Sequence, residues 1–260
     1  MRRDPIKSAS RALEVLDLFT EVRLPLRQKS IVQRLAYPQS SMTVLLKTLV
    51  ALGYLNYDRA TRTYFPTTRV AALGDWINLS MYGAGKLIEM MHAIQERTDE
   101  TVVLVSQNDL FIQYLRVIQP RHDFKVPPTE GAMRLLTQST GGLVLMSRMS
   151  DKAIDKLLRH INIHEEDRSQ RLDIGKLMEQ LIWVRREGYA FLAGTPIPGA
   201  AAIAMPLSGG PHSIPLAIGV GGVNARIVRH KSRIVEVMRE EIARSRDDLA
   251  TVAEGDHAVA

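Results

Sequence analysis

The sequence predicts an α+β fold made of two units, an N-terminal winged helix-turn-helix and a larger domain in which helices cover an antiparallel sheet. Three observations lead to this prediction. All of the net positive charge lies in the first 75 residues, helical segments followed by short aromatic strands fill that region, and β-rich and helical segments alternate after it. A chain of 260 residues with 45% hydrophobic content is long enough for two domains. We place them at residues 1–67 and 81–260, joined by a linker helix at 68–80.

Charge separates the two units clearly. Residues 1–75 carry 12 Lys or Arg and 6 Asp or Glu, whereas the remaining 185 residues carry 22 of each kind. A small basic unit beside a larger neutral one is typical of a phosphate-binding module attached to a second domain. The alternative interpretation is an ordinary solvated surface with a chance asymmetry.

Composition also limits the cellular setting. The chain has no cysteine, and charges interrupt its apolar runs well before the about 18 residues that a membrane helix needs. We therefore expect a cytoplasmic protein that has no membrane contact and no thiolate metal site.

The first helix is predicted by apolar residues at helical spacing. Leu13, Leu16 and Phe19 recur on one side, so the helix begins at Ser8 or Ser10 and ends near Thr20. Pro25 then interrupts the pattern.

Two further helices form the helix-turn-helix. The second lies within residues 27–35, and Ala36-Tyr37-Pro38 supplies the turn after it. The third runs from Gln39 to Leu52, and Gly53 stands where a residue with positive φ commonly ends a helix. Its predicted apolar side consists of Val44 or Leu45, Leu49 and Leu52.

The third helix carries a polar side that suits a DNA groove, because such a helix must bury one face and present small polar groups on the other. Glutamine pairs with adenine, serine and threonine reach phosphates or base edges, and lysine contacts phosphate or guanine. The alternative is that the serines only cap the helix. The residues that we assign to this contact are Gln39, Ser40, Ser41, Thr43 and Lys47.

A predicted β-hairpin follows the third helix and resembles a wing. Residues 54–57 and 63–65 are short aromatic strands, and residues 58–62 form a polar basic tip. Arg59 and Arg62 are placed to contact phosphates or a minor groove, and we assign Arg27 to the same surface. A solvated turn whose arginines have no particular role is the alternative.

Several segments, taken in order, resemble the IclR family of bacterial transcriptional regulators over nearly the whole chain. They are SRALEVLDLF, the helix-turn-helix, LVALGYLNYD, TRTYFPTTRVAALG and VRREGYA. One departure is Val44, since many members carry arginine at this position. An apolar side chain there meets a thymine methyl group or packs within the domain.

The segment after the wing predicts two helices, from Thr68 to about Ser80 and from Met81 to about Arg97. The resemblance implies that this region couples the two domains and helps to pair subunits into a homodimer or a dimer of dimers. The alternative is a helix that packs only within its own subunit.

The larger unit reads as a mixture of strands and helices. We predict strands at residues 101–107, 110–118, 189–194, 201–208 and 214–222, and helices at 139–149, 151–161 and 174–188. A long last helix runs from Ala225 to about Leu249, and its apolar stripe is interpreted as core or dimer seam. The resemblance implies a GAF-like ligand-binding domain that also supports oligomerisation.

No catalytic motif is found in the larger unit. It lacks a GxSxG segment and a P-loop, and Gly219 to Gly222 read as the end of a strand. We therefore predict no catalytic residue, metal or cofactor, and interpret the unit as a binding domain. The alternatives are a metabolic enzyme with an accessory winged helix, and a protein-interaction module.

The resemblance also implies where a ligand would bind. Members that bind small carboxylates use backbone amides at a helix start, which favours an anion. In this chain, Thr140 and Gly141 match the amide-donating pair, and Thr137 and Ser139 add hydroxyl groups. An ordinary helix cap would by itself explain Ser139.

Two positions indicate the type of ligand. Members that recognise small oxoacids carry an acidic residue shortly after Gly-Tyr and a polar residue on the next strand, where this chain has Leu192 and Ala202. Buried polar groups of a ligand need partners, so this wall favours a more apolar ligand. We predict an aromatic or otherwise hydrophobic organic acid, with its carboxylate at the helix start and its body against Met133, Leu192 and Ala202.

These predictions combine into one function. We expect a ligand-responsive regulator that binds a roughly palindromic, double-stranded operator and controls a catabolic operon. A family member without an effector is the alternative within the same class.

Overall fold

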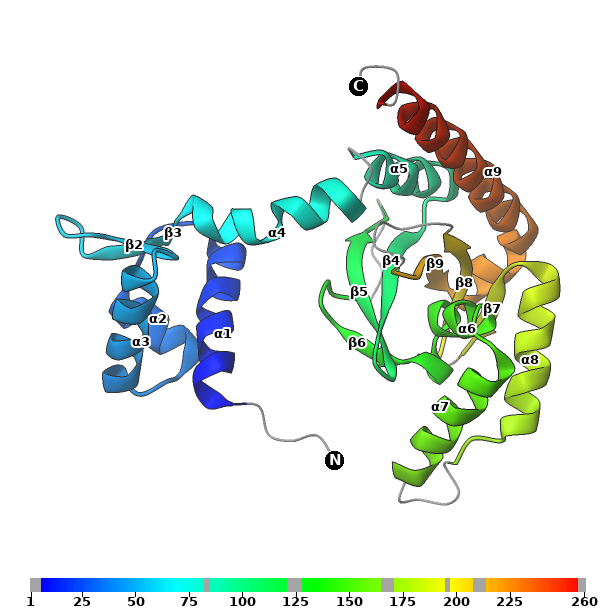
Figure 1. The fold of residues 1–260 in the computed structure, drawn as a ribbon, viewed down its shortest axis with the longest axis horizontal. Helices are drawn as coiled ribbons and strands as arrows, with labels where there is room; N and C mark the ends of the chain where they lie inside the picture. The colour runs from blue at the N-terminus through cyan, green and yellow to red at the C-terminus, as the bar shows by residue number, and fades with distance from the viewer. Residues whose placement is uncertain are drawn as a thin grey trace. The chain divides into compact units, whose positions relative to one another are not determined.

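The chain consists of two compact units, Met1–Asn78 and Leu79–Ala260. The computed structural model describes the backbone of residues 6–81, 85–120, 128–164, 171–194, 197–207 and 214–256, and the side chains of these residues except 75–81, 164 and 246–256. Each unit has its own hydrophobic core. Figure 1 shows the helices and strands of both units as ribbons.

The first unit is a three-helix head with a small sheet. In chain order its elements are α1 (Lys7–Val22), β1 (Leu26–Arg27), α2 (Gln28–Leu35), α3 (Gln39–Ala51), β2 (Leu55–Asp58) and β3 (Thr63–Pro66). The strands pair antiparallel in the order β1-β3-β2, so β2 and β3 form the predicted hairpin. Buried side chains from all three helices and the sheet make up the core, among them Val15, Ile31, Leu46 and Leu55.

Local signals place the turns of the head. Ala36 ends α2 with φ 54° and Pro38 precedes α3, so the helix-turn-helix is confirmed. Gly53 has φ 78°, a conformation that favours glycine, and the chain reverses there into the wing.

The predicted apolar side of α3 is partly wrong. Its buried residues are Met42, Leu46 and Leu49, whereas Val44 and Leu52 are 66% and 54% exposed. The buried face is therefore rotated relative to the predicted stripe, because Met42 and Leu46 lie one turn apart and face α1 and α2.

Two helices follow the wing. Helix α4 (Thr68–Met81) matches the helix predicted from Thr68 to about Ser80, and the next helix, α5 (Lys86–Thr98), begins later than the predicted Met81. Residues 82–84 lie outside the described part of the chain.

The second unit is built on a six-stranded antiparallel sheet with the order β6-β5-β4-β9-β8-β7. The strands are β4 (Thr101–Asn108), β5 (Phe111–Ile118), β6 (Met133–Leu135), β7 (Ala190–Ala193), β8 (Ala200–Leu207) and β9 (Leu216–Val223). Five of them confirm predicted strands. The short edge strand β6 was not predicted, because three residues are too few to show an alternating pattern.

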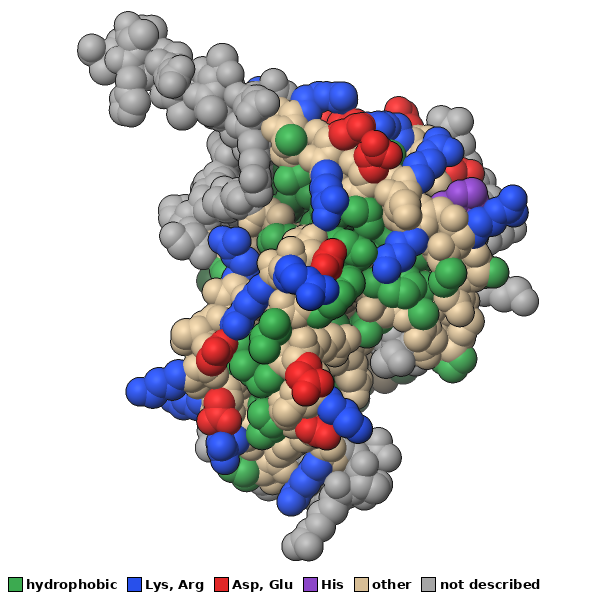
Figure 2. All heavy atoms as spheres, turned by 90° about the vertical axis from the view of Figure 1, so that its right-hand side faces the viewer, with side chains coloured by type: hydrophobic (Ala, Val, Ile, Leu, Met, Phe, Trp, Pro, Cys, Tyr) green, Lys and Arg blue, Asp and Glu red, His purple; other side chains and the backbone are tan. Residues whose placement is uncertain are grey.

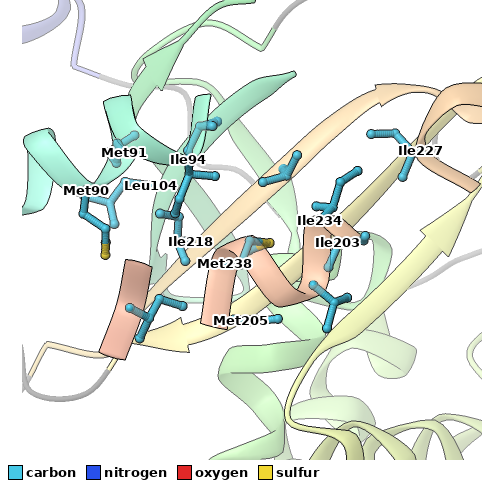
Figure 3. Packing of buried hydrophobic residues seen from close by; sticks show 14 of the residues in the cluster. Met90, Met91, Ile94, Leu104, Ile203, Met205, Ile218, Ile227, Ile234 and Met238 are labelled. Carbon is cyan, nitrogen blue, oxygen red and sulfur yellow. The ribbon is translucent and has the colours of Figure 1, made fainter. Parts of the chain in front are cut away.

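Helices cover both faces of this sheet. After the short 3-10 helix η2 (Leu136–Gln138) come α6 (Thr140–Ser147), α7 (Asp151–His164), α8 (Ile174–Glu187) and α9 (Asn224–Asp256). Helices α5 and α9 pack on one face, where Met91, Leu104, Ile218 and Met238 are buried together (Figure 3). Helix α6 packs on the other face and α8 packs against α6, in a core that includes Val105, Leu143 and Leu181 and side chains of α7.

The outer surface of the second unit agrees with its balanced charge. On the face that carries α8 and α9, acidic and basic side chains are interspersed around patches of apolar side chains (Figure 2). The order of helices and strands in the two units confirms the predicted α+β class, with a winged head followed by a sheet-and-helix domain.

Candidate nucleic-acid interface and ligand cavity

One face of α3 is open to solvent and carries three of the predicted DNA contacts, Ser40, Val44 and Lys47. Their spacing puts them on the side of the helix opposite to the buried Met42, Leu46 and Leu49. Gln39 is exposed as well, because it is the first residue of the helix. A helix that buries one side in its own domain and leaves the other side free can enter a major groove.

Ser41 and Thr43 lie at the edge of that face and are half-buried. The hydroxyl of Ser41 donates to the Pro38 carbonyl at 3.0 Å, and that of Thr43 donates to the Gln39 carbonyl at 2.8 Å. The side-chain amide of Gln28 donates to Thr43 Oγ1 at 2.6 Å. These two hydroxyls therefore also tie α3 to its own first turn and to α2.

The N-terminus of α3 has open backbone donors. Its N-cap residue is Pro38, which makes no side-chain cap, so the first amide groups of the helix have no acceptor within the helix. Together with the positive end of the helix dipole, these donors favour a phosphate group.

The wing is held in shape by Asp58. Its carboxylate accepts hydrogen bonds from the Ala60 amide at 2.8 Å and from the Thr61 hydroxyl at 2.7 Å, and both interactions lower its pKa. Arg59 and Arg62 are exposed at the tip, and Arg62 adopts a left-handed φ of 57°.

Arg27 lies on β1, beside the hairpin that forms the wing. It is exposed, and it pairs with Thr63, the residue of β3 that follows the tip. The three predicted arginines of the head therefore lie toward the tip end of the small sheet.

The second unit contains a cavity on the sheet face that carries α6. The cavity encloses about 770 Å³ when the part open to solvent is included. Small residues of β8 and β9 leave the space that larger side chains would fill, and apolar residues of β4, β5 and β7 line its sides. The small ones are Ala200, Ala202, Gly219 and Gly221, and the larger apolar ones include Val103, Val105, Ile112 and Leu192.

One end of the cavity lies at the start of α6. Ser139 is the N-cap residue, and its Oγ accepts a hydrogen bond from the Gly142 amide at 3.0 Å. The cap leaves the amides of Thr140 and Gly141 without an acceptor in the helix. Both residues line the cavity, as does Ser139, so the structure brings these three predicted residues together.

Arg134 also lines this end of the cavity. Arg134 pairs with Ile112 in the β5–β6 ladder. Ile112 lies beside the start of α6, because a methyl group placed on Gly141 would lie 3.8 Å from Ile112 Cδ1. The guanidinium makes no ion pair with any described residue, and no Asp or Glu is among the described residues that line the cavity. Among the described residues, this end therefore brings together a cation without an ion pair and two amides without an acceptor in the helix.

Two of the predicted ligand residues lie elsewhere. Met133 is 42% exposed and does not line the cavity, because its neighbour Arg134 occupies the inward position of β6. Thr137 is not among the lining residues either; its hydroxyl is shielded within η2 and has no hydrogen-bond partner among the described residues. Leu192 and Ala202 line the cavity as predicted.

Sequence reasoning missed three polar residues of the cavity wall, namely Thr101, Tyr114 and Arg134. Thr101 and Tyr114 lie on predicted strands, and side chains along a strand point alternately to the two faces of the sheet. Nothing in the sequence indicated which face carries the cavity.

A basic winged head with an exposed reading helix, followed by a separate sheet-and-helix domain, is the architecture of a DNA-binding transcriptional regulator. Residues 8–59 match the model of the IclR helix-turn-helix domain, and residues 84–246 match that of the bacterial transcriptional regulator IclR C-terminal domain. The chain belongs to the IclR family of transcriptional regulators.

Individual relatives agree with this assignment. The HTH-type transcriptional regulator BhcR of Paracoccus denitrificans is 24% identical, over 90% of this chain and 86% of the relative. The effector domain of an IclR-type regulator from Acinetobacter sp. ADP1 is 30% identical, with a TM-score of 0.59 over 64% of this chain and 96% of that domain.

A third relative was solved with a ligand. It is an IclR homologue from Microbacterium hydrocarbonoxydans complexed with 4-hydroxybenzoate, with a TM-score of 0.64, 20% identity, and coverage of 94% of this chain and 99% of the relative. The family and these relatives are transcriptional regulators, so the chain is a regulator and not an enzyme. Within the described residues, no helix is long and apolar enough to cross a membrane.

Proposed function

We propose that this regulator responds to an aromatic or otherwise hydrophobic organic acid. One observation carries the proposal: the cavity on the α6 face is mostly apolar, but its lining also includes Arg134 and the first two residues of α6, Thr140 and Gly141. A carboxylate beside these residues would give the cation and the amides a charge-assisted partner.

The remaining wall supports an apolar body for the ligand. Leu192 and Ala202 stand where a ligand hydroxyl or carbonyl would otherwise find a polar partner, and Val103 and Ile112 extend the apolar surface. The aromatic acid bound by the Microbacterium homologue has the same combination of a carboxylate and an apolar ring.

The head would read a roughly palindromic operator as part of a homodimer or a dimer of dimers. In this proposal the exposed residues of α3 contact the groove, namely Gln39, Ser40, Val44 and Lys47. The half-buried Ser41 and Thr43 and the arginines near the wing add contacts to phosphates and sugars; these arginines are Arg27, Arg59 and Arg62. Effector binding would favour one placement of the paired heads, since only a ligand with different affinities for two states can shift their populations. The target would be a catabolic operon, and the protein would act in the cytoplasm.

Calorimetry tests the ligand class. Purified protein is titrated with benzoate, 4-hydroxybenzoate and cinnamate, and separately with glyoxylate and pyruvate. We expect at least one aromatic acid to bind more tightly than either small oxoacid, and to change the mobility shift of promoter DNA from the region beside the gene. Tight binding of glyoxylate or pyruvate, with no binding of any aromatic acid, contradicts the proposal.

Light scattering on the free protein tests the assembly. We expect a mass of two or four chains, because two half-sites of a palindrome require two heads related by a two-fold axis. A monomer in both the free and the DNA-bound protein contradicts this part of the proposal.

A further inference from the structure

Within the described part of the chain, the buried hydroxyl of Thr101 has no hydrogen-bond partner. Thr101 is the first residue of β4 and is 2% exposed, and its Oγ1 forms no hydrogen bond within the described structure. A buried hydroxyl without a partner lowers stability, and valine has nearly the same shape without that penalty. An unpaired group of this kind in a folded protein needs an explanation.

The position of Thr101 on the cavity wall explains why its hydroxyl is unpaired. Side chains alternate along a strand, so Thr101, Val103 and Val105 share one face of β4, and all three line the cavity. Thr101 pairs with Gly221 on β9, which also lines the cavity and has no side chain to satisfy the hydroxyl. The hydroxyl is therefore on the wall of a site that a ligand would fill.

Thr101 and the anion-binding end lie at opposite ends of the same strand face. Gly141 contacts Val105, since a methyl group added to it would lie 2.7 Å from Val105 Cγ2. Thr101 is four residues away along β4, which corresponds to roughly 13 Å. Between the two ends the wall is apolar, with Val103, Gly219 and Ala202.

The chemistry at the Thr101 end is neutral. The neighbouring Glu100 is not among the described residues of the wall, and its buried carboxylate is paired with Arg226, whose Nη2 donates to it at 2.7 Å. No charged residue other than Arg134 is among the described residues of the wall. A second carboxylate of the ligand would be left without a countercharge there, whereas a hydroxyl or carbonyl group needs only one hydrogen bond.

We propose that the effector is an elongated organic acid with a neutral hydrogen-bonding group at the end opposite its carboxylate, and that Thr101 selects this group. The inference rests on the proposed function, because it takes the carboxylate to bind at Arg134, Thr140 and Gly141. It adds Thr101 as a specificity-determining residue, and it adds the requirement that the ligand carry a neutral hydrogen-bonding group. The apolar part of the wall does not impose this requirement.

Calorimetry with two matched pairs of acids tests the inference: benzoate with 4-hydroxybenzoate, and cinnamate with 4-hydroxycinnamate. Each pair is titrated into the wild-type chain, Thr101→Val and Thr101→Ser. We expect the wild type to bind the hydroxylated member of at least one pair about tenfold more tightly, as one well-formed hydrogen bond would provide. Thr101→Val should abolish this preference, and Thr101→Ser should keep it.

The outcomes separate the two proposals. If wild-type protein binds aromatic acids but shows no preference within either pair, or if Thr101→Val retains the preference, the role of Thr101 is overturned while the proposed function stands. If none of the four acids binds the wild type, both are overturned.

Thermal melting of the ligand-free variants provides a second readout. Because the hydroxyl has no partner, Thr101→Val should melt at the same temperature as the wild type or higher. A clearly lower melting temperature would mean that the hydroxyl is satisfied within the protein, which overturns the inference.

Discussion

Gly141 at the start of α6 and Val105 on β4 are in close contact: a methyl group added to Gly141 would lie 2.7 Å from Val105 Cγ2. Only a hydrogen atom fits between the helix and the strand at this point. The contact fixes the first turn of α6 against the sheet, and with it the two amides that face the cavity. The proposed anion site therefore depends on the absence of a side chain at Gly141.

The first prediction follows from this contact. Gly141→Ala should displace the start of α6, lower the affinity for an aromatic acid at least tenfold, and lower the free energy of unfolding by about 1–3 kcal/mol through overpacking. Calorimetry and urea unfolding measure the two effects, and operator binding by the head should persist. Gly74→Ala in α4 is the control, because its methyl group would meet no described atom within 4 Å. Unchanged acid binding by Gly141→Ala would place the anion site elsewhere.

The second prediction uses two neighbouring residues of β6. Arg134→Gln should weaken binding of the acid by roughly ten- to a hundredfold, since a charge-assisted hydrogen bond contributes about 1.5–3 kcal/mol. Met133→Gln should leave the affinity unchanged, because Met133 is 42% exposed and does not line the cavity. Calorimetry with the same acid compares the two variants. Equal losses in both would show that β6 acts through folding and not through the guanidinium.

This pair of residues also shows where sequence reasoning reached its limit. The helix-turn-helix and the wing were predicted closely, because Pro38, Gly53 and the aromatic strands are local signals. Which side chains of a strand point toward the cavity, in contrast, is not determined by local sequence signals. Arg134 lines the cavity and Met133, which the sequence analysis assigned to the ligand, does not, because neighbouring residues of a strand point to opposite faces.

The pairing of the strands determines which other residues line the cavity. Strand β6 pairs with β5 across residues 111–113 and 133–135, which are distant in the sequence. Thr101 faces the cavity because β4 lies between β5 and β9. Without the strand order, the sequence could assign Leu192 and Ala202 to a wall only through the family resemblance, and it offered no signal for Thr101.

The third prediction concerns the reading helix. Lys47→Ala should weaken operator binding and reduce the slope of log affinity against log salt concentration by about 0.9, as expected for the loss of one phosphate contact. Lys152→Ala is the control, since Lys152 is an exposed lysine on α7 in the second unit. Fluorescence anisotropy over a series of salt concentrations gives both slopes. If the two variants have the same slope as the wild type, Lys47 does not contact phosphate.

The last prediction concerns the wing and its dependence on pH. Asp58→Ala removes the acceptor that orders the tip, and Asp58→Asn keeps an acceptor oxygen for the Ala60 amide. Both variants lose the same negative charge, so a difference between them reports the order of the turn and not electrostatic attraction to DNA. We expect Asp58→Ala to bind the operator several-fold more weakly than Asp58→Asn in fluorescence anisotropy, with similar melting temperatures. Equal affinities would mean that the shape of the wing does not matter for binding.

The pKa of Asp58 determines when this turn is lost. The Thr61 hydroxyl and then the Ala60 amide stabilise the carboxylate and lower its pKa below the ordinary 3.8. A lowered pKa means that the stabilisation is fully present above the pKa of the unfolded chain, and is lost only as the pH falls through the lower pKa of the folded state. Operator binding between about pH 6 and 8 should therefore be independent of Asp58 titration. Carbon-detected NMR of the side-chain carboxyl measures this pKa directly, and a midpoint at or above 3.8 would show that the two hydrogen bonds do not form in solution.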